Sequence, residues 1–221
     1  MHIHLRDVIL GGQDGLVNVL GIILAMAGAT QDVRLIIISG LAATFAESLS
    51  MVAVGYTSSV AVKDVYNNIM KKEEHQSKYR KEEAKKEIID IYKKKGFKGT
   101  LLNRVVNHIT SNKKLMVDTM MKEEHDMTLE GFENPIINAA VIGMAALIGS
   151  VIPLLPFFIF DSVFYGMVLA VIVSVIALFF TGAYKAKLTG GRWLKEGIVL
   201  SVVGMGAAGL GYGIGLLLGL I

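Results

Sequence analysis

Five long apolar stretches constrain this 221-residue chain more than any other feature of its sequence. A helix needs about 20 mostly apolar residues to cross the hydrocarbon core of a bilayer. Backbone polar groups in a bilayer must bond within their own segment, so each stretch is expected to be helical. The sequence therefore predicts an all-α, polytopic membrane protein with five transmembrane helices and membrane lipid around them. The helices are expected at residues 8–30, 35–61, 136–156, 158–183 and 197–220.

Two details refine this expectation. Pro153 and Pro156 are expected to bracket the hairpin between the third and fourth helices, because proline rarely continues a helix. The fifth stretch is rich in glycine, and small residues allow helices to approach closely in lipid. We therefore expect the fifth helix to be a packing helix that also contributes to a subunit interface.

The charged residues are concentrated between the second and third apolar stretches. Sixteen of the 22 Lys and Arg residues lie between residues 63 and 122. This concentration, in a chain that is 53% hydrophobic, argues against a nucleic-acid-binding protein. We expect residues 63–133 to form a helical insert between spans one and two (1–62) and spans three to five (134–221).

The basic residues also predict an orientation, because they favour the cytoplasmic side of a membrane. With the N-terminus and the insert in the cytoplasm, 21 of the 22 basic residues lie inside and only Arg34 lies outside. The odd number of spans then places the C-terminus on the other side. The N-terminal residues carry no targeting signal, so a prokaryotic plasma membrane is expected rather than a vacuolar one.

Within the insert, the pattern predicts three helices. The first is expected from Lys71 to Tyr92, where three lysines and Gly96 form a typical helix end. The second is expected from Thr100 to Ile109. The third is expected to begin at Asn112, a good N-cap residue, and to run to about Asp126.

Two carboxylic acids interrupt the apolar stretches, Asp14 in the first and Glu47 in the second. Each costs about 2.5–3.5 kcal/mol at a helix centre, so such acids normally face a pathway or a partner. Asn18 lies one turn from Asp14, and Met51 lies one turn from Glu47. A carboxylate with a thioether favours a divalent transition metal over Mg²⁺ or Ca²⁺. The alternative is that both acids only hold helices together through hydrogen bonds.

The insert repeats this combination of acids and methionines. Glu83, Glu87 and Asp90 share one helical face, and Glu73 and Glu74 precede them. Further along the chain, four residues cluster within two turns: Met120, Met121, Glu124 and His125. Glutamates among lysines also occur on solvated, salt-bridged surfaces, so this alternative stays open.

Signatures of enzymes are missing from the sequence. It contains no cysteine, no phosphate-binding loop, no nucleophile elbow and no His-Glu-x-x-His motif. None of the five histidines follows a glutamate at the spacing that a di-iron bundle requires. We therefore expect neither an enzyme nor a prosthetic group.

Four segments resemble the vacuolar iron transporter family, the Ccc-type iron and manganese transporters. Residues 11–17 (GGQDGLV) resemble its first-span signature, and residues 48–51 (SLSM) its second-span signature. In the insert, residues 118–124 resemble the family's metal-binding end and residues 87–92 its preceding glutamate helix. The order of two spans, a charged helical insert and three spans matches over the whole chain.

The resemblance implies a homodimer with a pathway between the subunits, lined by the first two spans. It also implies export of cytosolic Fe²⁺, often with Mn²⁺, driven by proton antiport. Asp14 and Met51 match the family's intramembrane metal-transfer pair. The matching cytoplasmic ligands are Glu87, Met120, Met121 and Glu124, with Glu83 and either Glu73 or Glu74 as the nearest further candidates.

The second span departs from the family pattern. Where the family commonly has Gly-Glu-Tyr, this chain has Val54, Gly55 and Tyr56, and its acid is Glu47 instead. Glu47 is eight residues from Gly55, about 12 Å along a helix, so it cannot replace the missing carboxylate. It lies near the membrane centre, and we expect it either to couple protons to metal movement or to bind metal.

The sequence thus predicts an exporter of Fe²⁺ and Mn²⁺, with Co²⁺ and Zn²⁺ as further candidate ions. One alternative is a membrane-anchored cytoplasmic metal sensor or buffer without transport. A third hypothesis is a structural protein whose insert binds partners or anionic headgroups. Metal uptake into liposomes distinguishes the exporter from the sensor, which binds metal but moves none. An insert that binds no metal would indicate the structural protein.

Overall fold

The computed structural model describes residues 2–127 and 134–219, and side chains from residue 5 onward. The described residues form eight helices and no strand, which confirms the all-α prediction. They divide into two compact units, residues 1–57 with 135–221, and residues 58–134. The predicted end of the insert at residue 133 lies outside the described residues.

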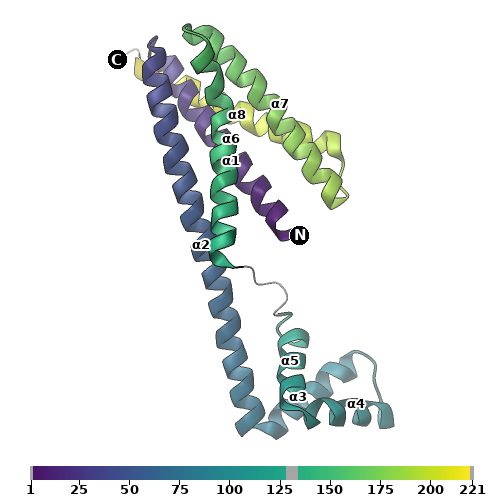
Figure 1. Cartoon of the computed structure of the whole chain (residues 1–221). Coiled ribbons are helices and arrows are strands. Elements are labelled where there is room, and N and C mark those ends of the chain that lie inside the picture. The colour runs from purple at the N-terminus through teal and green to yellow at the C-terminus, as the bar shows by residue number, and fades with distance from the viewer. Residues whose placement is uncertain (1, 128–133, 220–221) are drawn as a thin grey trace. The chain divides into compact units, whose positions relative to one another are not determined.

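Five helices are long and apolar enough to cross a membrane, as predicted. Four of them lie in the first unit and the fifth, α2, begins there (Figure 1). Their bounds are α1 (His2–Ala29), α2 (Val33–Tyr79), α6 (Pro135–Ile159), α7 (Val163–Thr189) and α8 (Trp193–Gly219).

Helix α1 forms the centre of this unit. Its buried residues Leu20 and Ile23 lie in a core cluster to which all five long helices contribute. Glycines bring α1 close to its neighbours: Gly15 packs on the backbone of Ala146 in α6, and Gly211 of α8 packs on the backbone of Gly21. A larger residue at these positions would collide with backbone, so small residues determine these helix contacts.

The glycines of α8 divide into two groups. Gly204, Gly211 and Gly215 would each place a Cβ against a neighbouring helix, which supports the expected packing role. At Gly206 and Gly209, by contrast, a Cβ would meet no atom of the described chain within 4 Å.

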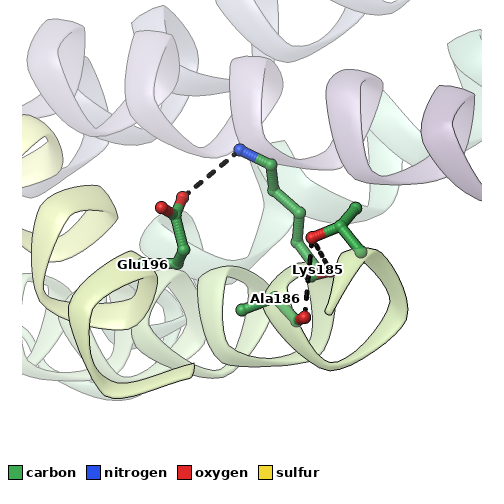
Figure 2. Close-up of polar contacts among 4 residues, drawn as sticks. Lys185, Ala186 and Glu196 are labelled. Atoms are coloured by element: carbon green, nitrogen blue, oxygen red, sulfur yellow. Dashed lines mark hydrogen bonds and ion pairs between the residues drawn. The ribbon is translucent and has the colours of Figure 1, made fainter. Parts of the chain in front are cut away.

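The hairpin between α7 and α8 is held by polar contacts. Gly190 ends α7 with φ 72°, a left-handed conformation that glycine adopts without strain. The Lys185 ammonium lies 3.5 Å from a Glu196 carboxylate oxygen, and the two side chains point toward one another in Figure 2. Both groups are partly exposed, so they form a structural ion pair at the helix ends.

The prolines of α6 do not bracket a hairpin, and that expectation was wrong. Pro153 and Pro156 lie inside α6, and the turn to α7 comprises residues 160–162. Prolines are tolerated in membrane helices because neighbouring helices can satisfy the freed backbone groups. Both prolines are buried in the unit, where such packing is available.

The predicted helix from Lys71 to Tyr92 is also wrong, because it is two helices. Helix α2 continues without a break from the second apolar stretch to Tyr79, and α3 (Lys81–Lys94) follows after Arg80. No proline or glycine marks this break. The physical reason is tertiary: Ala84 and Ile88 of α3 are fully buried among residues of the next two helices.

The remaining helices of the second unit match their predictions closely. They are α4 (Gly99–Ser111) and α5 (Lys113–Glu123). The Asn112 side chain caps α5 as expected, accepting hydrogen bonds from the backbone N–H groups of Lys114 and Leu115. Helix α5 ends three residues before the expected Asp126, and the turn that follows shapes a candidate site.

Candidate metal sites

The two intramembrane acids lie together in the structure. The Glu47 carboxyl on α2 lies beside the side chains of Asp14 and Asn18 on α1 and interacts with both. Asp14 and Asn18 are four residues apart and therefore share one face of α1. Sequence analysis had placed an acid in each span, and the fold brings them into one group.

This carboxyl pair has a restricted chemistry. An ionised carboxylate only accepts hydrogen bonds, so two ionised carboxylates cannot bond to each other. Two such charges side by side also repel strongly, and more so away from water. The pair is therefore stable when it holds one proton or one cation between its oxygens, with Asn18 supplying a further polar contact.

The pair lies at the edge of the helix bundle. Asn18 on α1 and the neighbours Phe45 and Leu49 on α2 are exposed in the single chain. Helix α2 is the least covered of the five apolar helices. In its apolar 18-residue stretch 22% is buried, against 50% in the corresponding stretch of α6. An exposed amide and carboxyl pair on a lipid-facing flank is unfavourable unless another surface covers it.

Met51, the predicted partner of Asp14, is buried against α6. It forms an apolar cluster with Ile142 and Ala146. Ala146 in turn contacts Gly15, the residue next to Asp14. A single residue, Ala146, therefore connects Met51 to the signature segment of α1.

Gly55 explains the departure in the second span. A Cβ at this position would lie 3.0 Å from the Cα of Ala139 and 3.1 Å from the Ile142 side chain. Any side chain there would require the Ala139 backbone and the Ile142 side chain to shift by a few tenths of an ångström. In this chain, the position serves close packing of α2 on α6.

In the second unit, a buried carboxyl stands out. Glu73 near the end of α2 is only 1% exposed, and its Oε1 lies 3.0 Å from His125 Nε2. Its other oxygen, Oε2, is buried and has no hydrogen-bond partner among the described residues. Glu124 joins this group, and one ligand atom from each of Glu73, Glu124 and His125 lies within 4.8 Å of the others.

The turn after α5 positions two of these three side chains. The backbone N–H of Met127 donates a hydrogen bond to the carbonyl of Met121, 3.0 Å away. Asp126 within the turn has φ 52°, a left-handed conformation that aspartate tolerates better than most residues. This reversal of the chain directs His125 back to Glu73 on α2.

The other predicted ligands of the insert differ in their surroundings. Glu87 is half-buried and accepts a 2.6 Å hydrogen bond from the Gln76 side chain. Glu74 is exposed, and Glu83 is exposed and paired with Arg80 at 3.4 Å. Met120 and Met121 are buried in two different apolar clusters.

Sequence analysis did not identify His125 as a ligand. It had noted the residue within the Met120–His125 cluster but assigned ligand roles only to its neighbours. A signal was present, since Glu124 and His125 follow directly after the apolar helix face. What could not be foreseen was that the chain reverses there and reaches a glutamate 52 residues earlier.

Known proteins match nearly the whole chain. A model of the VIT family matches residues 5–216. Vacuolar iron transporter 2 of Oryza sativa subsp. japonica is 28% identical over 208 residues, which are 94% of this chain and 85% of that protein. Vacuolar iron transporter 1 of Arabidopsis thaliana is 27% identical over 90% of this chain and 80% of its own length. Protein CCC1 of Saccharomyces cerevisiae is 29% identical over 93% of this chain and 66% of its own length.

Proposed function

The chain belongs to the VIT family, whose members are transporters and not enzymes, and from this premise we propose that it exports Fe²⁺ from the cytoplasm in exchange for protons. Two of the relatives named above are iron transporters by name, which supports metal ions as the transported species. Mn²⁺ is the second ion of the proposal, and Co²⁺ and Zn²⁺ are the further candidates. The metal ion is a transported substrate, and no prosthetic group takes part.

The neighbouring carboxyls of Asp14 and Glu47 carry this proposal. A pair that is stable with either a proton or a cation binds the two in competition. When a divalent ion enters, the shared proton leaves, and when a proton returns, the ion is released. This competition is the elementary step of an antiporter.

The same pair supports a homodimer. A second copy that covers the flank of α1 and α2 would shield Asn18 and Glu47 from lipid and place two carboxyl pairs on either side of a shared pathway. The thioether of Met51 is buried one turn from Glu47, and we propose that it favours transition metals over Mg²⁺ and Ca²⁺.

Direction follows from the basic residues. With the insert in the cytoplasm, ions gathered by its side chains enter the membrane from that side. Export then leads out of the cell across a prokaryotic plasma membrane, as expected from the sequence, or into a vacuole, as the relatives' names indicate for them. The proposed gathering residues are Glu73, Glu74, Glu83, Glu87, Met120, Met121 and Glu124.

Transport by purified protein in liposomes tests this proposal. Fe²⁺ and Mn²⁺ uptake is measured with a metal-sensitive dye, with and without a pH gradient. Glu47→Gln keeps the size and the hydrogen-bonding capacity of the side chain but cannot ionise, so it should stop uptake or make it independent of the gradient. Asp14→Ala should abolish uptake in a protein that still inserts and elutes at the native size.

Glu196→Gln is the matched control, because it removes a carboxylate from the Lys185 ion pair and leaves the intramembrane pair intact. It should transport like the wild type. Normal gradient-coupled uptake by Glu47→Gln would show that the acid only ties α1 to α2. A wild-type protein that binds metal and moves none would be a membrane-anchored sensor or buffer.

A further inference from the structure

The group formed by Glu73, Glu124 and His125 combines two carboxylates with one imidazole. We infer that His125 is a nitrogen ligand in a divalent-metal site completed by Glu73 and Glu124, and that this nitrogen sets the site's preference among transition metals. The inference deepens the proposed function, since it rests on the insert being the part that gathers metal.

The buried carboxyl of Glu73 is the first argument. Burying a carboxylate is costly unless its oxygens are paired. A proton on His125 would satisfy Oε1 alone, and Oε2 stays buried without a partner in the described chain. A structural ion pair therefore explains only half of this side chain. A cation beside the carboxylate would balance its charge and provide a partner for both of its oxygens.

The geometry is the second argument. Protein nitrogen and oxygen ligands lie about 2.0–2.2 Å from a transition metal such as Zn²⁺. Two ligands at right angles on such an ion are then about 3.0 Å apart. The separation of 3.0 Å between Glu73 Oε1 and His125 Nε2 fits this arrangement, and Glu124 lies within reach as a third ligand.

Access to the site is the third argument. Glu73 is enclosed, whereas the His125 side chain is 20% exposed and Glu124 is exposed. An ion can therefore arrive from solvent at Glu124 and move onto the enclosed carboxylate. The turn at Asp126 holds His125 at this opening.

The imidazole changes which ions the site prefers. Carboxylates suit Mn²⁺ and Mg²⁺, whereas imidazole suits Fe²⁺, Zn²⁺, Ni²⁺ and Cu²⁺, and affinity for nitrogen ligands rises from Mn²⁺ towards Cu²⁺. A site with one nitrogen should therefore bind Co²⁺ or Zn²⁺ more tightly than Mn²⁺ by a wider margin than an all-oxygen site.

Pulsed electron paramagnetic resonance on the full-length protein in nanodiscs tests this inference, with Mn²⁺ as the probe. Wild-type protein should show ¹⁴N coupling from a bound imidazole, and ¹⁵N-histidine labelling should replace that signal with ¹⁵N coupling. His125→Gln should lose the coupling, whereas the control His75→Gln should keep it. His75 lies on α2, as Glu73 does, but its side chain is exposed and packs against Tyr79.

Competition between Co²⁺ and Mn²⁺ for the same protein gives a second measurement. Changing a group that only supports a metal ligand costs about 10–100-fold in affinity. Loss of the ligand itself should lower the Co²⁺ affinity of His125→Gln by at least about 10-fold, with a smaller loss for Mn²⁺. The Co²⁺/Mn²⁺ affinity ratio of His75→Gln should equal that of the wild type.

Nitrogen coupling that is absent from Mn²⁺-loaded wild type, or that persists in His125→Gln, would overturn the inference. The labelling experiment needs no substitution, so a variant that fails to fold does not leave the question open. Neither readout measures flux. A protein that shows the coupling but transports no metal would retain this site and lose the proposed function.

Discussion

Replacing Glu73 by methionine should stabilise the metal-free insert and remove its response to metal. Methionine has a similar length and suits both helices and apolar surroundings. Replacing a buried ion pair by apolar residues is often stabilising by about 1–4 kcal/mol, whereas removing one partner is destabilising when the other charge stays buried. Glu73 is 1% exposed and has one unpartnered oxygen, so its removal should fall in this range. His125 keeps access to water when its partner is lost.

Hydrogen–deuterium exchange of the full-length protein measures both effects locally, on peptides from α5 and the end of α2. At about 1.4 kcal/mol for each factor of ten, metal-free Glu73→Met should exchange roughly 5-fold to 700-fold more slowly than wild type. Metal at 100 times its dissociation constant stabilises by about 2.7 kcal/mol, so wild-type exchange should slow about 100-fold. If Glu73→Met binds about 100-fold more weakly, the same concentration slows it only about 2-fold.

Glu74→Met is the matched control, because Glu74 is the exposed neighbour on the same helix. It should leave the metal-free exchange rate and the metal response of these peptides unchanged. Faster metal-free exchange in Glu73→Met would show that the carboxylate stabilises the insert by itself. A retained 100-fold response to metal would show that Glu73 is no ligand. Either result refutes the reasoning.

Two further predictions concern the membrane unit. Met51→Leu preserves the packing on Ile142, so it should lower the free energy of unfolding by less than about 1.5 kcal/mol. Because the thioether is gone, competition uptake assays should nevertheless show weaker discrimination of Fe²⁺ against Mg²⁺. Unchanged discrimination would show that Met51 has only a packing role. Gly149→Ala places a Cβ 2.8 Å from the carbonyl carbon of Gly12 and should destabilise by about 1–3 kcal/mol, seen as a lower melting temperature, whereas Gly206→Ala meets no atom within 4 Å and should melt like the wild type.

Local chemistry could be predicted from the sequence wherever it depends on neighbours in the chain. The five apolar helices follow from length and hydropathy alone, because a bilayer accepts few other structures. Asn112 was recognised as a cap because its side chain bonds to backbone only two and three residues away. Helix ends that depend on distant contacts were not predictable, as at Arg80, where no breaker residue marks the end of α2.

The candidate sites show the same division. Sequence alone identified Asp14, Glu47 and Glu124 as acids in unusual places, since a carboxyl in an apolar stretch or beside methionines is visible without a structure. Glu73 was only one of two alternatives that the family resemblance implied. Only the tertiary structure joined Glu47 to Asp14 and joined Glu73 to His125. Helical periodicity tells which side chains share a face of one helix, but it contains no information on which faces of two helices meet. That choice depends on close packing over the whole unit, for example on glycines such as Gly55 that let one backbone approach another.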